Sequence, residues 1–122
     1  MSTSSSTAST ESLFRLGLND ALPISEEATT SRVVVNNDIL RTVIFAFDAG
    51  QVLTEHASPR AVIVTLLEGE MDFSIGERVE RMSAGDVIYL APGDRHALTA
   101  VSPCRMQLVM VDVDKIDTTA AE

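Results

Sequence analysis

Between residues 31 and 113 the chain is a series of short runs rich in β-branched and apolar residues, each ended by turn-forming residues. The runs are SRVVV, ILRTVIFAF, AVIVTLL, MDFSI, VIYL, HALTAV and MQLVMVDV. The breaks between them contain Gly, Pro, Asn or Asp, and none of the runs repeats with a helical period. Seven short strands at this spacing predict an antiparallel sandwich or barrel, and therefore an all-β domain.

Two of these runs, residues 61–67 and 106–111, are apolar at almost every position. A strand with one wet face would instead carry a polar residue at every second position. Both faces of these strands must therefore be covered, by the N-terminal segment, by a second sheet or by another subunit. We expect a homodimer.

The N-terminal segment differs in composition from the rest of the chain. Residues 1–11 are mostly Ser and Thr, which bury too little apolar surface to offset the entropy of ordering, and we predict a disordered tail. Residues 12–30 contain a short apolar stretch around Phe14 and are predicted to pack as an arm on the main body or on a partner subunit. The barrel is predicted over 31–117, with a C-terminal tail over 118–122.

Length, charge and cysteine content narrow the functional classes. A chain of 122 residues supports one domain, and its formal net charge of −9, with a single lysine, argues against binding to nucleic acid or to a membrane surface. The sequence shows neither a signal peptide nor an apolar run long enough to span a membrane. A single cysteine, Cys104, precludes an intrachain disulfide, so we expect a cytoplasmic protein.

Two glycine-containing segments carry the only two histidines of the chain. In the first, five residues separate Gly50 from His56, one separates His56 from Ser58, three separate Ser58 from Val62 and six separate Val62 from Gly69. In the second, five residues separate Gly85 from Ala91, one separates Ala91 from Gly93, two separate Gly93 from His96 and three separate His96 from Ala100. A spacer of 15 residues, 70–84, separates them. In spacing and in their glycines these segments resemble the two motifs of the cupin family, over roughly residues 32–113. The resemblance implies a cupin double-stranded β-helix, which is a jelly-roll barrel with a pocket at one mouth.

The resemblance also bears on metal binding. In metal-binding cupins, two histidines and a glutamate of the first motif and one histidine of the second hold a divalent ion. In this chain, His56 occupies the position of the first histidine of the first motif, and His96 that of the histidine of the second motif. Ser58 stands in place of the second histidine and Val62 in place of the glutamate. A bound ion would be a divalent transition metal such as zinc, nickel, iron or manganese, held by two imidazoles and by donors from outside the motif.

Further residues are candidates for ligand binding at the barrel mouth. By the alternation of a strand, Ser58 and Val62 should share the face of His56, which would make the pocket mostly apolar. Arg60 and Arg95 lie near the histidines in the motif and could attract an anionic ligand. The competing interpretation is that Val62 is ordinary core and that the arginines are solvated.

Three functions remain open from the sequence. The first is a small-molecule-binding cupin without a strong catalytic constellation. The second is a metal-dependent cupin enzyme, of dioxygenase or isomerase type, with His56 and His96 as ligands. The third is a regulatory or interaction module that displays its outer face and its tail to another protein. A jelly-roll scaffold is compatible with all three.

Overall fold

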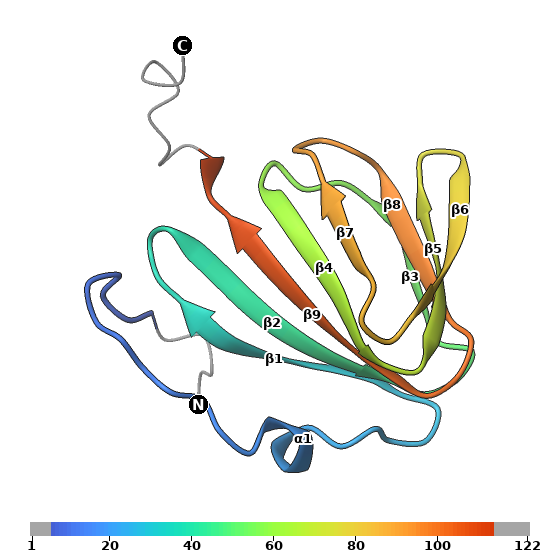
Figure 1. The fold of residues 1–122 in the computed structure, drawn as a ribbon, viewed down its shortest axis with the longest axis horizontal. Helices are drawn as coiled ribbons and strands as arrows, with labels where there is room; N and C mark the ends of the chain where they lie inside the picture. Colours follow the sequence, from blue (N-terminus) through green and yellow to red (C-terminus); the bar gives the residue numbers. More distant parts are fainter. Residues whose placement is uncertain (1–5, 114–122) are drawn as a thin grey trace.

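The computed structural model describes residues 6–113 of the chain, so that the predicted C-terminal tail and the last residues of the predicted barrel lie outside the described residues. Within that range the chain forms two antiparallel sheets and one helical turn (Figure 1). The elements are α1 (Leu18–Ala21), β1 (Thr29–Asn36), β2 (Leu40–Phe47), β3 (Val52–His56), β4 (Ala61–Glu68), β5 (Glu70–Ile75), β6 (Arg78–Ser83), β7 (Val87–Leu90), β8 (His96–Ala100) and β9 (Cys104–Val111).

The order of the strands defines a jelly roll. One sheet has the order β1-β2-β9-β4-β7 and the other β3-β8-β5-β6. Consecutive strands of the chain alternate between the sheets at several points, and all pairings are antiparallel. This confirms the predicted all-β barrel with an N-terminal arm. Strand β7 is one edge of the first sheet and strand β6 is one edge of the second. A short turn at residues 84–86 joins these two edge strands.

Two of the strands were not among the predicted runs. Strand β6 has the sequence RVERMS, and only Met82 in it is buried. Strand β3 has the sequence VLTEH and is exposed at most positions. Both are edge strands that bury few side chains, so the apolar alternation that marks a strand is weak in them.

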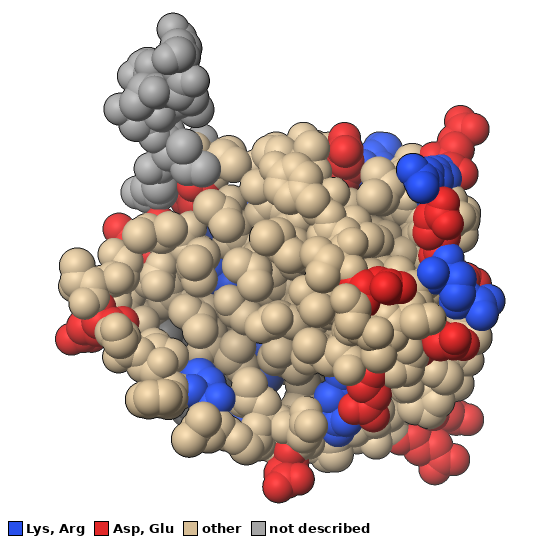
Figure 2. All heavy atoms as spheres, viewed as in Figure 1, with Lys and Arg blue, Asp and Glu red and all other residues tan. Residues whose placement is uncertain are grey.

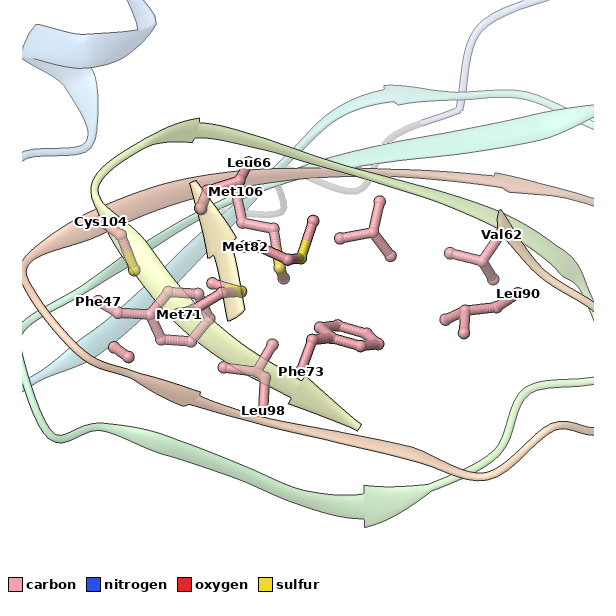
Figure 3. Close-up of a cluster of buried hydrophobic side chains, with 12 residues drawn as sticks. Phe47, Val62, Leu66, Met71, Phe73, Met82, Leu90, Leu98, Cys104 and Met106 are labelled. Atoms are coloured by element: carbon pink, nitrogen blue, oxygen red, sulfur yellow. The ribbon is translucent and has the colours of Figure 1, made fainter. Parts of the chain in front are cut away.

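The core lies between the two sheets (Figure 3). Val62, Val64 and Leu66 of β4 are buried in it, as are Leu98 and Ala100 of β8, so that inward positions alternate with outward ones along both strands. The buried cluster continues through both sheets and consists of Phe47, Val62, Val64, Leu66, Met71, Phe73, Met82, Leu90, Leu98, Ala100, Cys104 and Met106.

The N-terminal arm covers part of the outer face of the five-stranded sheet. Leu22 packs with Ile44 and Ala46 of β2 in a second buried cluster, and Leu18 and Ile24 contact the same cluster. The arm therefore lies on the main body, which is one of the two places predicted for it. None of the helical structure within residues 6–113 is long and apolar enough to cross a membrane.

Candidate functional site

A one-residue irregularity in β3 determines where His56 points. Leu53 lies opposite Leu98 of β8, and His56 lies opposite His96, so that three steps along β3 match two steps along β8. The extra residue is a β-bulge, which shifts the alternation of the side chains beyond it. Leu53 and His56 consequently line the same small cavity, although they are three residues apart.

The bulge brings the two histidines of the chain into contact. Their ring centroids are 4.2 Å apart, and the ring planes meet at 62°. His96 is buried, and the ring of Phe73 lies parallel to it at a centroid distance of 6.1 Å. His56 is exposed at the mouth. Two strands that are distant in sequence thus place both imidazoles at one end of the barrel.

Backbone carbonyl groups fix the tautomer of each neutral imidazole. The Nδ1 atom of His56 lies 2.8 Å from the carbonyl oxygen of Thr54, and Nδ1 of His96 lies 3.0 Å from that of Asp94. Since a carbonyl oxygen can only accept, each Nδ1 carries the proton and donates it. The Nε2 atom of each neutral ring therefore keeps its lone pair, which is the arrangement that metal-binding and hydrogen-bond-accepting histidines commonly show.

Burial also favours the neutral form of His96. Desolvation lowers the pKa of His96 below its ordinary value, and the nearby His56 acts in the same direction. The carbonyl and the charge of Asp94 oppose this shift. His96 in its neutral form is consequently suited to accept a hydrogen bond or to donate a lone pair through Nε2.

The remaining positions of the cupin ligand set do not supply donors. The Ser58 hydroxyl accepts a hydrogen bond from the backbone N–H of Arg60 at 3.1 Å, and Val62 is buried in the core with 3% of its surface exposed. No group of three or more His, Cys, Asp or Glu side chains that could hold a metal ion occurs within residues 6–113. The residues present thus do not fit the metal centre of catalytic cupins, which needs at least three protein ligands.

Neither candidate arginine lines the cavity between the two histidines. Arg95 forms an ion pair with Glu55, with 3.0 Å between Nη2 and Oε1, and both side chains are exposed. Arg60 lines a different hollow, which it shares with Arg41 and Met110. Of the six predicted site residues, His56 and His96 are brought together, whereas the other four do not line the cavity between them.

The cavity beside the histidines is small. Its volume is about 20 Å³, and apart from the two imidazoles it is lined by apolar side chains. A space of this size holds about one water molecule or one ion. Beside the histidines, the mostly apolar pocket predicted at the barrel mouth is therefore this small cavity.

A larger cleft, which the sequence did not reveal, lies where the edge strands β6 and β7 diverge. Its volume is about 430 Å³. Phe73, Ile75, Met82, Val87 and Ile88 give it apolar walls, and a further group of charged side chains completes the lining. That group consists of Arg78, Glu80, Arg81 and Asp86.

The charged residues around the cleft are already engaged in exposed polar contacts. The Arg78 Nε atom lies 2.8 Å from a carboxylate oxygen of Glu80, and Asp86 accepts a hydrogen bond from the backbone N–H of Ser83 at 2.8 Å. Arg81 bonds to Asp72 of β5, and this carboxylate raises the pKa of Arg81. Both signs of charge are therefore present beside an apolar floor. Phe73 lines both the cleft and the histidine cavity.

Comparison with known proteins agrees with this fold. The cupin domain family matches residues 43–112. A conserved protein of unknown function from Streptococcus pyogenes is 32% identical, with 84% of this chain and 90% of that chain covered and a TM-score of 0.74. A cupin superfamily protein from Desulfitobacterium hafniense is 17% identical, with 83% and 93% covered and a TM-score of 0.74.

A further solved structure, KdgF from a Halomonas species, is 22% identical, with 79% of this chain and 94% of that chain covered and a TM-score of 0.66. At this identity, and at that of the Desulfitobacterium protein, the likeness extends to the fold alone. No curated protein matches the sequence. Since the family match covers more than half of the chain and agrees with the strand order and with the two motif segments, the chain belongs to the cupin family.

Proposed function

We propose that the protein binds a small molecule with an apolar body and a polar end, and that the cleft between β5, β6 and β7 is its binding site. The observation that carries the proposal is the size and lining of the cleft. Small-molecule sites in proteins commonly occupy about 300 to 1,000 Å³ and combine apolar walls with a few polar groups. At about 430 Å³ the cleft lies in this range, whereas the histidine cavity, at about 20 Å³, does not.

The walls and the rim indicate which part of the ligand lies where. Phe73 and Ile88 would contact the apolar body, because both lie on the inner face of their strands. The charged residues at the rim would contact the polar end. Displacing Glu80 from Arg78 would free a guanidinium for an acidic group, at little cost because that ion pair is exposed.

The test uses two valines of equal exposure. Val87 and Val79 both lie on edge strands with 62% of their surface exposed, but only Val87 lines the cleft. The probe is 8-anilinonaphthalene-1-sulfonate, which has apolar rings and one acidic group. Wild type and Val79→Glu are expected to bind it with similar affinity, while Val87→Glu should weaken binding by about tenfold or more, since a carboxylate is placed against the bound rings.

A further variant separates the cleft from the barrel mouth. His56 lines the small cavity but not the cleft, so His56→Ala should bind the probe as wild type does. Circular dichroism of each variant checks the fold. Absence of binding to wild type, or equal losses in Val87→Glu and Val79→Glu, would contradict the proposal, and a loss in His56→Ala alone would move the site to the histidines.

The histidine pair favours a second candidate, which is weak and reversible binding of one divalent transition ion. The supporting observation is that both Nδ1 atoms are held by carbonyl groups, which leaves two Nε2 lone pairs near one cavity. Two imidazoles without a carboxylate should not retain an ion through dialysis. Elemental analysis of untagged protein is therefore expected to find well below one metal per chain.

Calorimetric titration with zinc tests this second candidate directly. Weak binding that His56→Ala and His96→Ala each abolish would support it. Zinc binding that neither substitution changes would refute it. Stoichiometric metal after dialysis, lost in both variants, would instead support the metal-dependent enzyme considered from the sequence.

A further inference from the structure

Strand β2 carries an arginine on the inner face of the five-stranded sheet. Arg41 lies opposite Met110 of β9, and Met110 lies opposite Val62 of β4, whose side chain is buried in the core. Side chains directly opposite each other on paired strands share a face, so Arg41 is on the face turned toward the other sheet. It is the second residue of β2 and is half-buried. A cationic group thus stands at the end of a face whose next inward positions along β2 are apolar, Val43 and Phe45.

A second arginine reaches the same place from another part of the chain. Arg60 directly precedes β4 and comes shortly after His56, the last residue of β3, so it lies at the end of the barrel that holds the histidines. Arg41 and Arg60 both line one hollow of about 230 Å³, the arginine hollow, to which Met110 contributes an apolar side chain. Within residues 6–113, no residue lines both this hollow and the histidine cavity.

No carboxylate of the described residues forms an ion pair with either arginine of the hollow, although four other arginines are paired in this way. The paired arginines are Arg78, Arg81, Arg95 and Arg105. Figure 2 shows acidic side chains at several points around the outline of the molecule, with arginines beside some of them. The Nε atom of Arg41 lies 3.4 Å from Oδ1 of Asn36, which is a long hydrogen bond. The charge of both half-buried guanidiniums therefore remains available to an anion from solution.

Two carboxylates also line the hollow and weaken its attraction for anions. Asp38 lies in the turn between β1 and β2, and Asp112 directly follows β9. Asp38 is exposed, so solvent and salt screen its repulsion of a bound anion more than they screen the attraction of the half-buried arginines. We therefore expect moderate rather than tight affinity for an anion.

We propose that the arginine hollow binds the oxyanionic group of a small molecule, a phosphate or a carboxylate, with Arg41 and Arg60 donating to its oxygens. Each guanidinium presents a planar fork of donors that matches two oxygens of such a group. The hollow has room for several water molecules, and Met110 offers an apolar contact to a short organic part of the ligand. Within the described part of the chain, no residue lines both this hollow and the cleft between β5, β6 and β7, so the proposal does not depend on the function proposed above.

Nuclear magnetic resonance titration of the full chain with inorganic phosphate gives both the affinity and the location of binding. Proton–nitrogen spectra resolve the Nε–H groups of the arginines. The signals of Arg41 and Arg60 should shift and saturate with a Kd on the order of 1 mM, as expected for about two charge-assisted hydrogen bonds. The signal of Arg32 should stay in place, because Arg32 is exposed and lies opposite Ile44 on the outer face of the same sheet.

Three variants remove one positive charge each. Arg41→Gln and Arg60→Gln should each raise the Kd for phosphate about tenfold, which is the effect of losing one charge-assisted hydrogen bond. Arg32→Gln makes the same change of net charge outside the hollow and should leave the Kd unchanged to within about twofold. The amide spectrum of each variant without phosphate checks that it is folded.

Succinate is the second probe and distinguishes a carboxylate ligand from a phosphate. Binding of either probe that both hollow variants weaken and Arg32→Gln does not would support the proposal, and the probe with the lower Kd identifies the source of the oxyanion. If neither probe saturated wild type below about 20 mM, the proposal would be overturned. Equal losses in all three variants would also overturn it, since net charge alone would then control binding, as would saturable shifts confined to other arginines.

Discussion

The contrast between two glycines gives the sharpest test of how the barrel is held together. Gly50 and Gly69 have φ angles of +88° and +86°, in the left-handed region that side chains disfavour. A Cβ atom added at Gly50 would meet nothing within 4 Å. At Gly69 it would collide with the carbonyl oxygen of Pro103 and lie 2.6 Å from Cβ of Cys104. The two sites thus share a backbone penalty and differ in the space available.

The expected losses follow from these two contributions. An alanine in the left-handed region costs about 1 to 2 kcal/mol. The stiffer unfolded chain offsets about 0.4 to 1 kcal/mol of this. Gly50→Ala should therefore lower the free energy of unfolding by about 1 kcal/mol. Gly69→Ala adds overpacking against backbone atoms, which typically costs about 1 to 3 kcal/mol, for a total of about 3 kcal/mol.

A loss of about 3 kcal/mol is a large part of the roughly 5 to 15 kcal/mol that stabilises a domain. Urea unfolding followed by far-ultraviolet circular dichroism measures both losses. Thermal unfolding should show midpoint decreases of about 4 °C for Gly50→Ala and about 12 °C for Gly69→Ala. If the two variants differed by less than about 0.5 kcal/mol, the close approach of Gly69 to Pro103 and Cys104 would not contribute to stability, and the reasoning would be wrong.

Three further predictions concern charge and reactivity. Hydrogen bonds from the backbone N–H groups of Glu27 and Ala49 lower the pKa of Asp48 below 3.8, so the ionised carboxylate stabilises the fold above that pH and loses this effect as the pH falls through the lowered pKa. In acid unfolding, Asp48→Asn should therefore lose less stability than wild type over this pH range. Equal losses of stability in the two proteins would contradict the assignment. Burial raises the pKa of Cys104 to about 11, which lowers the fraction of reactive thiolate. Ellman's reagent should therefore react about 100-fold more slowly with the folded protein than with the protein in urea. Rapid reaction with the folded protein would show that the thiol is accessible. Arg105→Ala should lower the free energy of unfolding by about 1 to 2 kcal/mol in urea titrations, because this guanidinium bonds to Glu68 and its side chain is only 13% exposed. A matching loss in Arg78→Ala, where the side chains of both partners are mostly exposed, would show that burial of Arg105 does not contribute.

Much of the fold could be predicted because its strongest local signals agree with one another. The apolar runs of β4 and β9 mark two neighbouring interior strands of one sheet, and the inward positions of β4 are buried as alternation predicts. The edge strands carry less information. β6 was missed because a strand that buries Met82 alone has no apolar pattern to read.

The candidate site was harder to predict than the fold, for two physical reasons. The bulge before His56 lies in the sequence VLTEH, which has no glycine to mark it, and its position depends on how β3 pairs with β8. The cleft arises from the separation of two edge strands that belong to different sheets. Neither feature is local, so motif spacing could place His56 and His96 on one end of the barrel but could not find the larger space.

The packing of Val62 has a consequence for how this chain could change over evolutionary time. Val62 lies opposite Leu90 and Met110 on the neighbouring strands, and it is buried among the side chains of the core. A glutamate arriving there by mutation would have to be desolvated among apolar neighbours before any metal could reward it, at a cost of several kcal/mol. Stepwise acquisition of a four-ligand centre would therefore pass through a poorly folded intermediate. Because Val62 belongs to the core, selection for stability disfavours a charged ligand at this position, and substitutions on the exposed surfaces of the barrel are better tolerated.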